Sequence, residues 1–208
     1  MRTLYAAKAA EAHRENGDWA FVDIGFASNA RSCGIAVNDD LPIELTFADL
    51  QIHLLQLARA SDRPLNLVLE APLSVAFSAA GNPTGRAIET RDGKARYWYF
   101  GLGCGVLVAA TYLLRALYDG SRERDVNLYE GLVSFKPKKA RSSHAADVLA
   151  MRGIVWQQQG FTGRVVAPEE LRAAPLDRLQ SAFVVAGFDL GIPPVIAVGP
   201  PKKILPSD

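Results

Sequence analysis

The order of apolar and polar residues predicts short strands and helices in turn, and two of the strands are apolar along almost their whole length. These two runs cover residues 19–27 and 65–70. Continuous apolar runs of this kind are typical of strands that are buried on both sides in a mostly parallel sheet. Between them, residues 33–37 predict a hairpin partner for the first strand, and residues 42–45 predict a third short strand.

Apolar residues at helical spacing predict the helices. Thr46 is a candidate N-cap, and Phe47, Leu50, Leu54 and Leu57 follow it at intervals of three or four. Ser142 or Ser143 is the candidate cap of a later helix. The expected helices cover residues 4–15, 47–60, 101–118, 143–158 and 176–186, the remaining strands 125–135, 165–166 and 195–198, and a long surface loop 71–96.

This order predicts an α/β fold, a mixed sheet with helices on its faces. The chain has 208 residues, of which 49% are hydrophobic, so we expect one domain over residues 1–208. No apolar run reaches the length of about 18 residues that a membrane span requires. Residues 1–5 do not resemble the start of a secretory signal, and Cys33 and Cys104 form no metal-ligand spacing, so we expect a cytoplasmic protein with reduced thiols.

Three acids are the candidate chemistry of the chain. Asp23 and Glu70 each end an apolar run, and Asp147 follows His144 by three residues in a predicted helix. A buried carboxylate is costly unless a positive group meets it, and neighbouring carboxylates repel each other. A hard cation such as Mg²⁺ resolves both problems. The alternatives are an ordinary turn aspartate for Asp23, a cap or arginine partner for Glu70, and a solvated surface acid for Asp147.

Basic residues gather in two stretches. One is the loop with Lys136, Lys138, Lys139 and Arg141, directly before the helix that carries Asp147. The other contains Arg86, Arg91, Lys94 and Arg96 and runs into the aromatic residues 97–100. Cations neutralise phosphates and aromatic rings stack on bases, so both stretches are candidates for nucleic-acid binding. The alternatives are a solvated basic turn for the first stretch and aromatic residues that dock the long loop onto the core for the second.

Short motifs in these segments resemble the ribonuclease H-like superfamily. Residues 23–28 with Gly34-Ile35-Ala36-Val37 resemble the first motif of RuvC-type Holliday-junction resolvases, Glu70 matches their second acid, and residues 144–150 are similar to their last motif. In that superfamily the first aspartate binds the catalytic metals, and the glycine lets backbone and substrate approach closely. The resemblance implies a mixed five-stranded sheet flanked by helices on both faces, with a core at about residues 19–157 and a C-terminal extension over 158–208.

Other residues resemble the DUF429 family of predicted nucleases, a second branch of the same superfamily. Glu70-Ala71-Pro72-Leu73 and Val133-Ser134-Phe135 carry this resemblance, which makes Asp177 the alternative third acid. Gln180 stands where this family has a further aspartate, and Asn127 where it has a glutamate.

The resemblance implies a nuclease that uses Mg²⁺ or Mn²⁺ to hydrolyse phosphodiester bonds, RuvC-like and selective for DNA structure. Asp23 is expected to bridge two ions, Glu70 and Asp147 to hold one each, and His144 to act as a ligand or proton carrier. The expected partner is nucleic acid, DNA rather than RNA, with no membrane, and a homodimer would suit a two-fold symmetric junction. The alternative is a non-catalytic module of the same fold that binds nucleic acid or protein.

Overall fold

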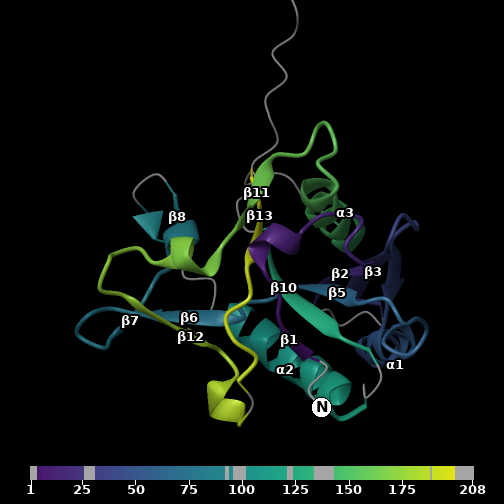
Figure 1. The fold of residues 1–208 in the computed structure, drawn as a ribbon, viewed down its shortest axis with the longest axis horizontal. Helices are drawn as coiled ribbons and strands as arrows, with labels where there is room; N and C mark the ends of the chain where they lie inside the picture. Colours follow the sequence, from purple (N-terminus) through teal and green to yellow (C-terminus); the bar gives the residue numbers. More distant parts are fainter. Residues whose placement is uncertain are drawn as a thin grey trace, which may run out of the picture.

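An eight-stranded mixed sheet forms the centre of the structure (Figure 1). The computed structural model describes residues 4–25, 31–91, 94–95, 102–120, 124–133, 143–187 and 189–199. The sheet has the order β11-β13-β10-β5-β2-β3-β4, and β1 also pairs with β10. Its strands are β1 (Leu4–Ala6), β2 (Asp18–Ile24), β3 (Cys33–Val37), β4 (Ile43–Leu45), β5 (Leu65–Glu70), β10 (Val126–Leu132), β11 (Gly163–Val166) and β13 (Val195–Val198).

The middle of the sheet is parallel. β2, β5 and β10 run in the same direction, and β1 and β13 are both parallel to β10. These two strands lie one after the other along the same edge of β10: Leu4 is level with Val126, and Val195 is level with Glu130. β3, β4 and β11 are antiparallel to their neighbours. The two apolar runs, in β2 and β5, therefore lie in the buried centre of the sheet, as their sequence predicts, and β10 lies there beside β5.

Three α-helices pack against this sheet in the described part of the chain: α1 (Phe47–Leu57), α2 (Leu102–Gly120) and α3 (His144–Val155). The hydroxyl of Thr46 accepts a hydrogen bond from the Asp49 N–H at 3.0 Å, so α1 has the predicted cap. Ser143 caps α3 in the same way, accepting from the Ala146 N–H at 3.2 Å. None of the described helices combines the length and the apolar character needed to cross a membrane.

The side chains of β2 divide between two separate core clusters. Ala20, Val22 and Ile24 belong to the cluster that contains α1 and α2. Trp19 and Phe21 belong to the cluster that contains α3. Because successive side chains of a strand point to opposite sides of the sheet, this alternation decides on which side each functional residue lies.

A smaller sheet corrects two predictions. It has the order β12-β6-β7, with β6 (Ser74–Phe77), β7 (Pro83–Thr84) and β12 (Arg178–Ser181). Residues 71–96, expected to form a loop, thus contain strands and the short 3-10 helix η2 (Ala87–Glu89), followed by β8 (Thr90–Arg91) and β9 (Lys94–Ala95). Residues 176–186, expected to be helical, form β12 and η4 (Val184–Ala186). Pairing of β6 with β12 across about half the chain overrides the local helical pattern.

Two further differences concern the ends of the chain. Residues 4–15, expected to be helical, form β1 and the short 3-10 helix η1 (Ala9–Glu11), because Leu4 is completely buried where β1 pairs with β10. The main sheet has eight strands where five were expected. Of the three strands beyond these five, β11 and β13 cover the short strands predicted at residues 165–166 and 195–198, whereas β1 was expected to be helical. A further 3-10 helix, η3 (Pro168–Leu171), follows β11.

Candidate metal centre

Asp23 and Glu70 stand side by side at the ends of two parallel strands. Asp23 is the penultimate residue of β2 and Glu70 is the last residue of β5, and the two are register partners. Phe21 and Val68, two residues before them, lie in the core cluster of α3. Since residues two apart in a strand share a side of the sheet, both carboxylates point to the side on which α3 packs.

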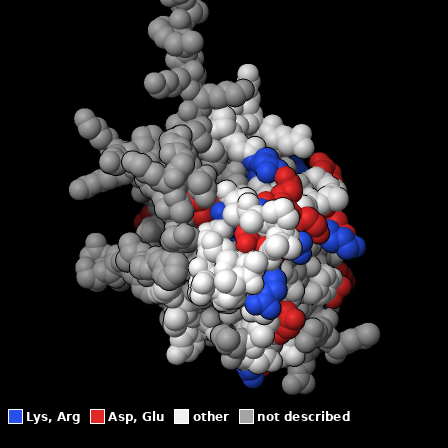
Figure 2. All heavy atoms as spheres, turned by 90° about the vertical axis from the view of Figure 1, so that its left-hand side faces the viewer, with Lys and Arg blue, Asp and Glu red and all other residues white. Residues whose placement is uncertain are grey.

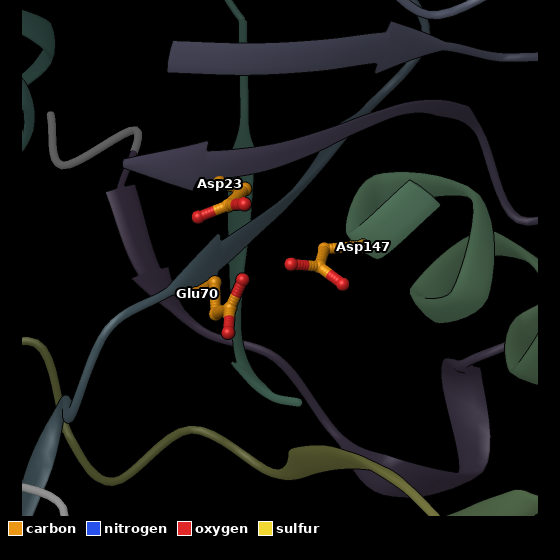
Figure 3. Close-up of side chains that lie close together, drawn as sticks. All are labelled: Asp23, Glu70 and Asp147. Carbon is orange, nitrogen blue, oxygen red and sulfur yellow. The ribbon is translucent and has the colours of Figure 1, made fainter. Parts of the chain in front are cut away.

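Asp147 completes the group from α3. It lies in the first turn of this helix, whose N-terminal end carries a partial positive charge that favours a carboxylate. One carboxylate oxygen from each of Asp23, Glu70 and Asp147 lies within 4.8 Å of the others. Figure 3 shows the three side chains converging from the ends of β2 and β5 and from α3. Asp23 and Asp147 are only 6% exposed, so the group is largely shielded from water.

The three acids fit a divalent cation. Two oxygens on opposite sides of an ion are about 4.2 Å apart around Mg²⁺ and about 5 Å apart around Ca²⁺. Among three ligands of one octahedral ion only one pair can be opposite, and adjacent ligands of Mg²⁺ are about 3 Å apart, so oxygens spaced by up to 4.8 Å need to come closer by up to about 2 Å. Hard cations prefer carboxylate oxygens, and a cation would also relieve the mutual repulsion of three buried acids. The group can hold a metal ion, as the sequence predicts.

His144 contacts this group through Asp23. Its Nδ1 lies 2.6 Å from Oδ2 of Asp23, and the ring donates because an ionised carboxylate only accepts. The imidazole is 33% exposed and so connects the buried acid to solvent. This geometry makes His144 a residue that orients a metal ligand, a common arrangement around metal sites.

Gly25 and Gly34 make room for His144. A Cβ atom on Gly25 would lie 2.5 Å from Nε2 of His144, and one on Gly34 would lie 2.8 Å from the His144 Cβ. Both distances are far shorter than a normal contact. The glycines that follow the first acid thus allow the first residue of α3 to approach the strands closely, which places Asp147 within reach of Asp23.

No protein-family model, curated protein or solved structure matches the chain. The resemblance of its motifs to ribonuclease H-like proteins therefore stays a hypothesis.

Asp177, the alternative third acid, has a local role. It is buried, and its carboxylate accepts a hydrogen bond from the N–H of Ala174 at 2.9 Å, which closes the turn before β12. Among the described residues, the acids grouped with Asp23 and Glu70 include Asp147 and do not include Asp177. Gln180 is exposed on β12, and Asn127 on β10 donates to Asn66 at 3.0 Å.

Arg86 corrects one prediction for nucleic-acid binding. It is completely buried and pairs with Glu130 and Glu89, so it cannot reach a phosphate on the surface. The side chains of Arg91 and Lys94 lie outside the described part, as do the whole residues Arg96, Lys136, Lys138, Lys139 and Arg141. On the face shown in Figure 2, the basic and acidic side chains of the described residues are interspersed.

Glu130 and Glu89 are buried acids that the sequence analysis does not single out. Glu130 lies in the middle of a strand whose other residues are mostly apolar, and a charged residue in such a run is unusual without a partner. This charge within an apolar strand is the feature of the sequence that indicates a buried partner for Glu130. The partner, Arg86, comes from an irregular segment and could not be assigned from local sequence.

An apolar pocket opens beside Gly25, on the side of the sheet where α1 and α2 pack. Its volume is about 310 Å³, and its lining includes Ile24, Gly25, Ser32, Phe47, Val108 and Tyr112. Val108 and Tyr112 are mostly exposed at its rim. Gly25 is thus shared by the pocket and by the space that the His144 ring fills.

Proposed function

We propose that this protein is a divalent-metal-dependent nuclease that hydrolyses phosphodiester bonds in nucleic acid with Mg²⁺ or Mn²⁺. The observation that carries the proposal is the convergence of Asp23, Glu70 and Asp147, with carboxylate oxygens within 4.8 Å of one another. Carboxylates that hold hard cations beside an open site are a recurrent arrangement in phosphodiester chemistry.

The arrangement of elements supports the proposal. β2 and β3 form a hairpin, and β4, α1, β5, α2, β10 and α3 follow, with β6–β9 inserted between β5 and α2; apart from this insertion, the order agrees with the one that the resemblance implies. α1 and α2 pack in one core cluster and α3 in the other (Figure 1). The acids stand in the motifs that resemble the RuvC-type resolvases, at the ends of β2 and β5 and at the start of α3.

In the proposed nuclease, Asp23, Glu70 and Asp147 would hold the metal. A pair of bound divalent ions would supply activation of water and stabilisation of the leaving oxygen. His144 fixes the orientation of the Asp23 carboxylate through its 2.6 Å hydrogen bond, and its partly exposed ring is the candidate proton carrier.

Cleavage assays test the proposal. Labelled single-stranded, duplex and four-way-junction DNA and RNA are incubated with Mn²⁺ and with the wild type, Asp23→Asn or Asp177→Asn. We expect cleavage by the wild type and by Asp177→Asn, whose carboxylate lies outside the metal group, and none by Asp23→Asn. DNA cleavage that prefers the junction would support a RuvC-like, structure-selective activity. Equal cleavage by Asp23→Asn would overturn the assignment.

The second candidate function is a non-catalytic module of the same fold that binds nucleic acid or protein. It is favoured by Gln180, an amide at the place where the DUF429 resemblance expects an acid. Binding of the tested nucleic acids by wild type and Asp23→Asn alike, with no cleavage by either protein, would favour this function.

A further inference from the structure

Arg86, Glu130 and Glu89 form a buried ion-pair network next to the strand end that carries Glu70. Nη2 of Arg86 donates to Oε1 of Glu130 at 2.7 Å, and Nη1 donates to Oε2 of Glu130 at 2.8 Å. Nη2 also donates to Glu89 at 3.0 Å, and Nη1 donates to the hydroxyl of Ser74 at 2.8 Å. Arg86, Glu130 and Ser74 are completely buried, and Glu89 is almost so.

The network lies on the opposite side of the sheet from the three acids. Val126 and Leu128 of β10 belong to the core cluster of α1 and α2, and Glu130, two residues further, points the same way. Its register partner on β5 is Leu69, the residue before Glu70. One peptide unit of β5 thus separates the network from a metal-ligand candidate.

The network also holds the turn that leaves Glu70. Oε2 of Glu130 accepts a hydrogen bond from the N–H of Leu73 at 2.8 Å. Arg86 holds Ser74, the next residue, through its hydroxyl. Ala71 and Leu73 are completely buried. The segment after Glu70 is therefore fixed by charged hydrogen bonds, which are roughly twice as strong as neutral ones.

Burying these charges carries a cost. Burial raises the pKa of Glu130, while Arg86 and the Leu73 N–H act in the opposite direction. Burial alone would lower the pKa of Arg86, and Glu130 and Glu89 raise it instead. Apolar residues in place of such a buried pair are often neutral or even stabilising. Stability alone does not account for the network, whereas its bidentate, directional geometry suits a positioning role.

We propose that Arg86 and Glu130 are positioning residues of the metal centre, fixing the Ala71–Ser74 turn and through it the Glu70 carboxylate. This inference rests on one part of the proposed function, namely that the three acids form the metal site. Groups that hydrogen-bond metal ligands directly typically contribute about 10- to 100-fold to metal affinity, and this pair acts on Glu70 through the turn that follows it. Loss of the pair should weaken metal binding by an amount in this range, although neither residue belongs to the metal group.

The test measures Mn²⁺ affinity by titration calorimetry, at a temperature where every variant is folded by circular dichroism. The variants are the double substitution Arg86→Met with Glu130→Met, which removes the bidentate pair, keeps apolar volume and leaves Glu89 without its arginine, and Arg86→Lys, which keeps the charge and loses the fork. The control is Asp18→Asn. Asp18 pairs with the buried Arg124 at the opposite end of β2, so its loss destabilises the sheet away from the metal group.

We expect the double variant to bind Mn²⁺ at least tenfold more weakly than the wild type, Arg86→Lys to be intermediate, and Asp18→Asn to keep wild-type affinity at a lower unfolding midpoint. Wild-type affinity in the folded double variant, or in Arg86→Lys if the double variant does not fold, would overturn the positioning role and leave the metal site intact. A wild type that binds no Mn²⁺ would instead overturn the proposed metal site.

Discussion

Replacing Asp147 by Asn should stabilise the protein without metal and should remove most of the stabilisation that metal gives the wild type. Two unit charges 4.8 Å apart repel by about 1 kcal/mol in water and about 3.5 kcal/mol at an effective dielectric constant of about 20. The substitution removes two of the three pairwise repulsions in the acid group. It also loses a favourable helix-end interaction of about 0.3–1 kcal/mol. We therefore expect the free energy of unfolding in EDTA to rise by about 1–6 kcal/mol, according to how strongly solvent screens the acids.

With metal the advantage of the variant should shrink, and the order reverses where that advantage is below about 2.7 kcal/mol in EDTA. At a concentration of Mn²⁺ 100 times its Kd, the wild type gains about 2.7 kcal/mol, and a variant that binds far more weakly gains little. Urea unfolding in EDTA and in Mn²⁺, followed by circular dichroism, measures both changes. The matched control is Asp177→Asn, whose amide oxygen can still accept from the Ala174 N–H but without the charge, so it should be less stable than wild type by up to about 1 kcal/mol in both conditions. If Asp147→Asn behaved like this control, the three acids would not form a repelling, metal-binding group.

Three other predictions follow from single contacts. Gly34→Ala places a Cβ 2.8 Å from the His144 Cβ, so it should lower the unfolding free energy by about 1–3 kcal/mol and weaken Mn²⁺ binding. Urea unfolding and calorimetry measure the two effects, and unchanged values in both would contradict the close approach of α3. Thr46→Ala removes the cap of α1 and should cost about 1 kcal/mol in urea unfolding, with Mn²⁺ affinity unchanged because α1 lies in the other core cluster. A thiol reagent at pH 8 should label the exposed Cys104 in the native protein and Cys33 only in denaturant, because Cys33 is buried and burial raises the pKa of its thiol. Labelling of both cysteines at the same rate in the native protein would refute this difference in reactivity.

The metal group was accessible to sequence analysis because its parts lie in strongly patterned segments. Asp23 and Glu70 end apolar runs that have few alternatives to a buried strand, and buried parallel strands end along one side of a sheet. Ser143 marks the start of α3, which fixes Asp147 in the first turn. What the sequence left open was the choice between Asp147 and Asp177, because that choice depends on which segment packs against β2.

The network behind the metal group was not accessible. Arginine is almost always exposed, so Arg86 was assigned to a surface for nucleic acid. Its burial depends on Glu130, which is 44 residues later in the chain. In the same way, Leu176, Leu179 and Phe183 have helical spacing, but the pairing of residues 178–181 with β6 decides their structure. Long-range contacts of this kind leave no local pattern.

The shared edge of β10 has a consequence for synthesis of the chain. β1 can occupy its half of this edge once β10 has left the ribosome, but the half from Glu130 to Leu132 waits for Val195–Ala197. Until then a stretch of central strand presents unpaired N–H and C=O groups to other nascent chains, which is the usual starting point of aggregation. Slow translation or truncation before β13 should therefore reduce the soluble yield of this protein. The charge of Glu130 in this stretch should disfavour pairing with other chains while the edge of β10 is unpaired.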